Sequence, residues 1–399
     1  KKSYVKNQMR ILFYNGNGDL LKTITTVESK HISSVKSADL DNDGKKEVIV
    51  GIAAGYILKP RGVYVYDYST GSKIWHYNIG PNPNSITIAN VTGDASKEII
   101  FGTIGPWNGN YDNGISDSES AVICLSSDGK RLWMHKFEKR GFVDAQVAVS
   151  DLDGDGRNEI IACTQEHGWN KWDGKWGKVY IINPENGEIE KVHDFGKPVM
   201  HWTGMGIADF NGDGKKEIVV AVKDGSKKET KITMLDSDLK LLHEYVISDS
   251  RAKIEAINDI NGDGKNEVII CPTAIKKLIF LGYDLAELWS YTLGDHGSAI
   301  VSDLIPGGTN EIIVSADKLY VFGSIFGSIF EDNFSELNLS KWIPFGSPSP
   351  RVLDSVYGRS GVFDNNGDSW CASGIISKNA LSLTPPFTIE SDVYLDLQS

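Results

Sequence analysis

Short runs of apolar, mostly β-branched residues recur along this chain, and each run follows an acidic loop. Residues 159–163 form such a run directly after the loop that begins at Asp151. Comparable loops begin at positions 39, 90, 151, 209, 259 and 303, so the spacing varies from 44 to 61 residues. A repeat of about 40 to 60 residues with strand-forming runs is typical of a β-propeller, whose blades are four-stranded sheets.

Each repeat has room for four strands. In the third repeat we expect them at 145–149, 159–163, 178–182 and 188–195. The second strand of each repeat is apolar at nearly every position, as expected for a strand that is buried on both faces. Asn186-Gly187, between the third and fourth strands, favours a tight hairpin. A tryptophan recurs in the fourth strand and is expected to pack between neighbouring blades; these residues are Trp75, Trp133 and Trp289.

The two ends of the repeat region predict how the ring closes. Residues 9–27 predict a hairpin with no strand pair before it, and the last repeat continues only to a strand at 318–323. Together these segments would complete one blade and remove the exposed sheet edges. We therefore expect an all-β, six-bladed propeller over residues 1–323, closed by its N- and C-terminal strands, with seven blades as the alternative.

A different pattern follows the repeats. Residues 324–330 predict a short linker, and residues 331–399 contain short alternating strands separated by glycine, proline and asparagine turns. A β-sandwich usually needs about 100 residues. Residues 331–399 therefore predict only the first part of such a domain, and we expect both ends of the chain to be incomplete.

The acidic loops indicate calcium sites. Alternating carboxylates on a tight loop converge on one point, and Ca²⁺ takes six to eight oxygen ligands with flexible geometry. We expect side-chain ligands at loop positions 1, 3, 5 and 9 and a backbone carbonyl at position 7. The four clear sites are Asp39, Asp41, Asp43, Lys45 and Glu47; Asp151, Asp153, Asp155, Arg157 and Glu159; Asp209, Asn211, Asp213, Lys215 and Glu217; and Asp259, Asn261, Asp263, Lys265 and Glu267.

Two copies of the loop are eroded. The copy at 90–98 predicts a weak fifth site, formed by Asn90, Thr92, Asp94 and Glu98. In the copy at 303–311, Ile305 and Gly307 replace ligands, so we expect no site there. Bound ions would clamp the turn between the first and second strands, because the unfilled carboxylates repel one another.

Composition narrows the classes of function. The formal net charge is −12, which argues against a nucleic-acid partner because phosphate binding needs a basic surface. No run of 18 apolar residues is present, so no membrane span is expected. The first residues lack the apolar core of a signal peptide, as a mature or excised fragment would. The cysteines have no metal-ligand spacing and are expected to be buried thiols; they are Cys124, Cys163, Cys271 and Cys371.

The repeated motif Asp-x-Asp/Asn-x-Asp-Gly-x-x-Glu, followed by an apolar strand, resembles the FG-GAP/VCBS repeats of integrin α propellers and of many secreted microbial proteins. The resemblance covers residues 1–323 and implies a calcium-binding propeller. Position 9 is Glu where integrins usually have Asp, which weakens the expectation of an integrin-like function. Residues 329–399 resemble the first half of a concanavalin/laminin-G-like jelly roll.

Ligand binding is expected on the side of the ring opposite the acidic loops. Two connections between the second and third strands, at 105–112 and 165–176, are long and aromatic. Aromatic rings with nearby polar groups can stack on sugar rings and bind their hydroxyls. The expected ligand residues are Trp107, Tyr111, His167, Trp169, Trp172, Trp176 and Trp202.

Three functions remain open at this point. The first is an extracellular or cell-surface binding, adhesion or scaffold protein whose partner is a carbohydrate or a surface protein. The second is a secreted enzyme that resembles propeller-type rhamnogalacturonan lyases, with candidate catalytic residues His31, His201, Arg251, Lys253 and His296. The third is an architectural subunit that assembles with other surface subunits. Sequons at Asn333 and Asn338 are compatible with glycosylation.

Overall fold

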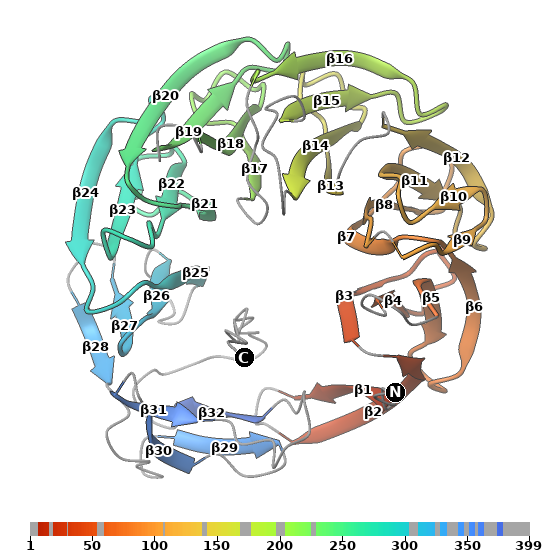
Figure 1. Cartoon of the computed structure of the whole chain (residues 1–399), viewed down its shortest axis with the longest axis horizontal. Coiled ribbons are helices and arrows are strands. Elements are labelled where there is room, and N and C mark those ends of the chain that lie inside the picture. Colours follow the sequence, from red (N-terminus) through yellow and green to blue (C-terminus); the bar gives the residue numbers. More distant parts are fainter. Residues whose placement is uncertain are drawn as a thin grey trace. The chain divides into compact units, whose positions relative to one another are not determined.

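The computed structural model describes residues 7–15, 19–29, 31–53, 60–106, 108–137, 142–167, 177–196, 204–224, 229–302, 310–323, 328–332, 342–346, 351–355, 358–362 and 373–377. Every regular element in these residues is a β-strand, which confirms the all-β prediction (Figure 1). No helix that could cross a membrane is found in this part of the chain. The chain forms two compact units, 1–13 with 20–209 and 213–246, and 14–19 with 210–212 and 247–399.

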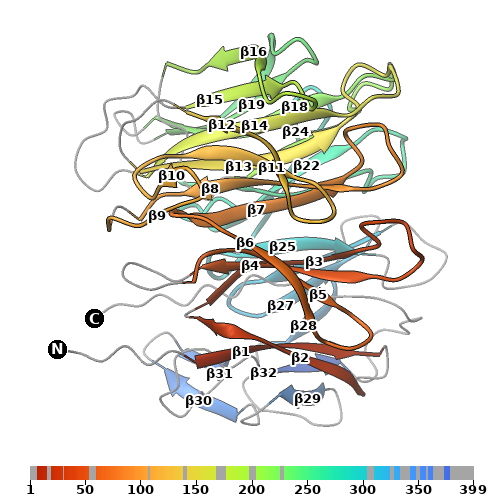
Figure 2. The same ribbon diagram turned by 90° about the vertical axis from the view of Figure 1, so that its right-hand side faces the viewer.

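The first unit consists of antiparallel strands that pair in chain order. Its strands are the hairpin β1 (Asn7–Tyr14) and β2 (Leu20–Ser29); the sheet β3 (His31–Ala38), β4 (Glu47–Ala53), β5 (Gly62–Asp67) and β6 (Lys73–Asn78); the group β7 (Asn82–Ala89), β8 (Glu98–Ile104), β11 (Ala121–Leu125) and β12 (Arg131–Lys136); the short hairpin β9 (Tyr111–Asp112) and β10 (Ile115–Ser116); the group β13 (Phe142–Ser150), β14 (Glu159–His167), β15 (Lys178–Ile182) and β16 (Ile189–Asp194); and the sheet β17 (Met205–Ala208), β18 (Glu217–Asp224), β19 (Glu229–Leu235) and β20 (Leu241–Ser248). Figure 2 shows β13 to β16 side by side in this order.

The second unit continues the same four-stranded pattern. It contains β21 (Ile254–Asn258), β22 (Glu267–Ile270), β23 (Lys277–Leu281) and β24 (Glu287–Thr292), then β25 (Ser298–Ser302), β26 (Glu311–Ser315), β27 (Leu319–Phe322) and β28 (Ser328–Asp332), and finally the pairs β29 (Trp342–Gly346) with β32 (Ser373–Ser377) and β30 (Arg351–Ser355) with β31 (Gly358–Val362).

The last four-stranded sheet corrects one prediction. Residues 324–330 were expected to be a linker, but β28 pairs with β27 from Phe322↔Ser328 to Leu319↔Asp332. Alternation explains the difference, because Ile329 and Phe330 lie within a five-residue strand whose glycine-containing neighbours look like a linker in sequence. The final repeat therefore has its own fourth strand within the described residues.

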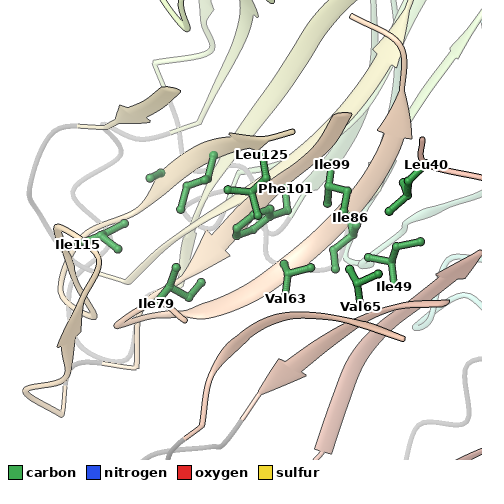
Figure 3. Packing of buried hydrophobic residues seen from close by; sticks show 12 residues of the cluster. Leu40, Ile49, Val63, Val65, Ile79, Ile86, Ile99, Phe101, Ile115 and Leu125 are labelled. Atoms are coloured by element: carbon green, nitrogen blue, oxygen red, sulfur yellow. The ribbon is translucent and has the colours of Figure 1, made fainter. Parts of the chain in front are cut away.

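The apolar runs form the core between successive sheets. In β4 every residue is buried, as the continuous apolar pattern predicts. Figure 3 shows Ile49 and Val63 of one sheet packing with Ile86 and Phe101 of the next. Burial of each such side chain contributes about 1.5–3 kcal/mol. The repeats are therefore stabilised through their neighbours.

Close backbone approach fixes one glycine. The groups β7–β12 and β13–β16 are joined where Asp144 of β13 pairs with Ile104 of β8. A Cβ atom at Gly102 of β8 would collide with the backbone of Ala145. Only glycine permits this approach between the strands.

The recurring tryptophans join neighbouring sheets, as predicted. The Trp75 indole Nε1 donates a hydrogen bond to the Ser127 carbonyl at 3.0 Å, which lies in the β11–β12 turn of the next group. Trp289 of β24 contacts Phe322 of β27 edge to face, with ring centroids 5.6 Å apart. Cys124, Cys163 and Cys271 are buried free thiols, as predicted, and Cys371 lies outside the described residues.

Candidate functional site

The four clear acidic loops have the same internal hydrogen bonds. The aspartate at position 1 accepts the backbone N–H of position 6 through Oδ2, at 2.9 to 3.0 Å; the pairs are Asp39–Gly44, Asp151–Gly156, Asp209–Gly214 and Asp259–Gly264. The aspartate at position 5 accepts the N–H of position 7 at 2.8 to 2.9 Å; the pairs are Asp43–Lys45, Asp155–Arg157, Asp213–Lys215 and Asp263–Lys265. These bonds fold each loop into the same tight turn.

Left-handed backbone conformations shape these turns. Position 6 is glycine with φ between 84° and 86° in all four loops. Position 4 is also left-handed, with φ of 79° at Gly154 and 62° at Asn42. Glycine and asparagine are the residues that tolerate this region best. The sequence prediction missed position 4, although its glycine or asparagine in every clear copy was the available signal.

Carboxylate oxygens converge in two of the loops. Oxygens of Asp39, Asp41 and Asp43 lie within 4.8 Å of one another, and so do oxygens of Asp151, Asp153 and Glu159. Two such charges about 5 Å apart repel by roughly 3 kcal/mol at an effective dielectric of 20. Acceptor-only oxygens at this separation suit a hard divalent cation. In the loops at 209–217 and 259–267, an asparagine amide stands at position 3 and offers a neutral oxygen.

The glutamate at position 9 has a structural role of its own. Its Oε2 accepts the backbone N–H of position 2 in the same loop, at 2.8 to 3.0 Å; the pairs are Glu47–Leu40, Glu98–Val91, Glu159–Leu152 and Glu267–Ile260. Burial raises the pKa of Glu267 to about 7, and the nearby Asp263 and Asp259 carboxylates add to the shift. Each glutamate can therefore close its loop with one oxygen and leave the other for a cation.

The eroded loop at 90–98 differs in the way that its sequence predicts. Asn90 accepts the Gly93 N–H at 2.8 Å, and Asp94 accepts the Ser96 N–H at 2.7 Å. The Ser96 hydroxyl also bonds to Asp94. This loop is closed by neutral groups, and it is not among the convergent acidic groups of the described residues.

One of the expected ligand residues is displayed at the opposite end of the strands. Tyr111 begins β9 and is 65% exposed. The hairpin of β9 and β10 turns at Asn113 and Gly114, both left-handed. The Asn113 side-chain amide donates to the Asn78 carbonyl at 2.8 Å, so the tip is attached to the preceding sheet.

A buried ion pair holds the base of this hairpin. Asp117 accepts the backbone N–H groups of Asn108, Gly109 and Asn110 at 3.0 to 3.2 Å. Arg61 lies 3.4 Å from Asp117, and both side chains are 1% exposed. Arg61 also donates to the Gly80 carbonyl at 2.6 Å. The loop that displays Tyr111 is thus anchored in the protein interior, a feature that the sequence did not reveal.

The other expected ligand residues are not placed by the structure. Trp107, Trp169, Trp172, Trp176 and Trp202 lie outside the described residues. The backbone of His167 ends β14 opposite Phe142.

The candidate catalytic residues are only partly brought together. His31 begins β3, where its backbone pairs with Ala53, and His201 lies outside the described residues. His296 is exposed beside Asp295, with 3.3 Å between Nδ1 and Oδ1, and Arg251 is also exposed.

Lys253 belongs to a compact polar group within the second unit. Its Nζ lies 3.2 Å from Glu255 Oε2 and donates to Ser298 Oγ at 3.2 Å. The Ser298 hydroxyl donates to Glu255 at 2.8 Å. Glu255 is the extra residue of a β-bulge in β21, which turns its side chain toward β25. Its side chain is 3% exposed, and burial raises its pKa despite Lys253.

Comparisons with known proteins agree with the β-propeller prediction. Residues 151–220 match the model of the FG-GAP-like repeat family. A solved rhamnogalacturonan lyase, YesW, is similar to the chain at 17% identity and a TM-score of 0.54, over 92% of this chain and 68% of that protein. No match is found among the curated proteins.

Two further solved structures are similar at lower TM-scores. A rhamnogalacturonan lyase from Bacillus licheniformis has 14% identity and a TM-score of 0.46, over 83% of this chain and 65% of that protein. BamB from Moraxella catarrhalis has 13% identity and a TM-score of 0.47, over 86% and 87%. At these identities the likeness concerns the fold, which is that of a β-propeller.

Proposed function

We propose that the chain is a calcium-stabilised binding protein of the cell surface or extracellular space, built on a six-bladed β-propeller. The observation that carries this proposal is the convergence of Asp39, Asp41 and Asp43 oxygens within 4.8 Å, on a loop whose fold recurs along the chain. Carboxylates so close together are stabilised by a divalent cation. In this view residues 331–399 belong to a jelly-roll module.

Each loop would hold its ion with the residues named from the sequence. Positions 1, 3 and 5 supply side-chain oxygens, and the carbonyl at position 7 is oriented by the bond between its own N–H and position 5. The ion supplies positive charge that offsets the repulsion among the carboxylates. The loop joins the first two strands of its sheet, so the ion's effect is on stability.

The calcium proposal is tested with purified protein. Equilibrium dialysis is expected to find about four calcium ions per chain, each held by oxygen ligands. Calcium at a hundredfold excess over Kd stabilises a single site by about 2.7 kcal/mol, which raises the melting temperature. An unchanged melting temperature after chelation, with no calcium in dialysis, contradicts the proposal.

The binding role is proposed for the surface around Tyr111. Its ring is exposed on a hairpin that Asp117 and Arg61 fix from below. A rigid exposed aromatic ring loses little conformational entropy when a sugar ring stacks on it. A carbohydrate is therefore the favoured partner, with a surface protein as the alternative.

A glycan array tests this role. Tyr111→Ala is expected to abolish binding, whereas Tyr111→Phe retains the stacking ring and is the matched control. Trp172→Ala tests the second aromatic loop. A wild-type chain that binds no glycan supports the purely architectural role instead.

A second candidate is a polysaccharide lyase, which the Lys253 group favours. Its ammonium is partly exposed and is fixed by Glu255 and Ser298, so it could pair with a uronate carboxylate. The solved proteins with a similar fold include rhamnogalacturonan lyases. Incubation with rhamnogalacturonan and other uronate polymers would give an unsaturated product with new ultraviolet absorbance. Absence of product from every polymer excludes this candidate.

A further inference from the structure

Neighbouring acidic loops are joined by backbone hydrogen bonds. The Lys216 N–H, at position 8 of the loop at 209–217, donates to the Leu152 carbonyl of the loop at 151–159 at 2.8 Å. The Lys97 N–H, at the same position of the loop at 90–98, donates to the Leu40 carbonyl at 2.8 Å. The two links are equivalent, and both lie within the first unit.

The Leu152 residue is held from both sides. Its N–H donates to Glu159 Oε2 at 2.8 Å, while its carbonyl accepts the Lys216 N–H. Its side chain is 1% exposed and packs in a cluster with Ile218 of the next sheet. Leu152 therefore cannot shift without affecting the start of β18.

Both partners of this link stand beside proposed calcium ligands. Leu152 lies between Asp151 and Asp153, and Lys216 lies between Lys215 and Glu217. Lys216 Nζ also donates to Ser150 Oγ at 2.9 Å, a second connection between the loops. When an ion draws in the ligands of one loop, the displacement is transmitted to the ligands of the other loop through contiguous contacts.

We propose that Lys216 is a positioning residue and that the loops at 151–159 and 209–217 bind calcium as a coupled pair. This inference rests on the proposed calcium function. By linkage, each ion raises the affinity of the other site by the same factor. The loop at 39–47 has the equivalent link, but its neighbour at 90–98 lacks the acidic ligand set. Its site therefore binds calcium independently and serves as an internal comparison.

The first experiment compares Asp153→Ala with Asp41→Ala by calcium titration against a competing chelator. Both residues are exposed and occupy position 3 of their loops, so folding is retained. Asp41→Ala is expected to remove one ion and leave the other affinities unchanged. Asp153→Ala is expected to remove one ion and weaken a second by about fivefold or more. Equal effects of the two substitutions overturn the coupling.

The second experiment removes the link itself. Lys216→Pro eliminates the donating N–H, whereas Lys216→Ala retains it and loses only the contact with Ser150. Lys216→Pro is expected to weaken calcium binding at both loops by about fivefold or more relative to Lys216→Ala. Lys97→Pro, paired with Lys97→Ala, controls for the loss of one interloop hydrogen bond, and melting in chelator measures that loss alone.

The outcomes separate the two proposals. If the wild-type chain binds no calcium, the proposed calcium function fails. If it binds calcium and Lys216→Pro has the same affinities as Lys216→Ala, the function stands and the coupling is wrong.

Discussion

The Trp133 indole Nε1 donates a hydrogen bond to the Pro184 carbonyl at 2.7 Å, which joins β12 to the β15–β16 turn of the next group. The ring also lies against Gly187 of that turn, where a Cβ atom would be 2.5 Å from the indole. Trp75 and Gly129 have the same relationship one repeat earlier, at 2.7 Å. Tryptophan in one repeat and glycine in the next therefore form one packing unit.

This unit predicts that Gly187→Ala destabilises the protein more than backbone strain alone would. Gly187 has φ of 76°, whereas Gly196 has φ of 62° and a Cβ atom there would meet no atom within 4 Å. Gly196→Ala is expected to cost about 1–2 kcal/mol, because alanine is strained in the left-handed region. Gly187→Ala adds an overpacking cost of about 1–3 kcal/mol. Chemical denaturation measures both, and equal losses would contradict the packing role.

A second prediction concerns Glu98, which stays buried in the eroded loop. Its Oε2 accepts the N–H of Val91 at 2.9 Å and that of Thr92 at 3.3 Å. Glu98→Ala leaves these donors without an acceptor and is expected to cost about 1–3 kcal/mol for each buried group left unsatisfied. Because the role is structural, the loss should be the same in calcium and in chelator. Asp94→Ala, at an exposed position, is the control and should have a smaller effect.

A third prediction compares two exposed turn aspartates whose pKa values are lowered for different reasons. Hydroxyl and amide donors of Ser69 and Thr70 lower the pKa of Asp67 to about 2. Lys130, followed by Ser126, lowers the pKa of Asp128 to about 2. A lowered folded-state pKa contributes stability above the unfolded value of 3.8, and this is lost as pH falls through about 2.

Salt distinguishes the two causes. At about 1 M salt the Debye length falls to about 3 Å. The pKa of Asp128 should then rise toward its ordinary value, while that of Asp67 should change little. Carboxyl carbon chemical shifts, followed by NMR during an acid titration, measure both groups in one experiment. An equal response of the two residues to salt would show that their hydrogen bonds do not account for the difference.

Much of the fold follows from local pattern. Residues 178–182 are β15 with the predicted bounds, because an apolar run between two turn signals permits little else. β28 was missed because glycine and serine on either side of its short run made residues 324–330 look like a linker. The buried role of the position-9 glutamate could have been found from Glu98 and Glu311, which persist where other ligands are lost.

Contacts between distant residues could not be predicted in the same way. Arg61 and Asp117 are 56 positions apart, and neither has a sequence neighbour that marks it as buried. The Glu255 bulge depends on the register of β21 against β22, in which Ile254 pairs with Ile270 and Ala256 with Ile269. Periodicity gives the strands but not such registers, because one extra residue moves a side chain to a different neighbour.

The Arg61–Asp117 pair leads to the last prediction. Asp117 accepts backbone N–H groups from the loop that precedes the Tyr111 hairpin, and both charges are buried. Removing one partner of a buried pair leaves an uncompensated charge, so Asp117→Ala and Arg61→Met should each cost about 3–5 kcal/mol. The double variant should lose less than the sum, because it leaves neither charge stranded. Chemical denaturation of all four chains measures the coupling. Additive losses would mean that the pair does not act as a unit, and retained Tyr111-dependent glycan binding in Asp117→Ala would mean that it does not hold the hairpin.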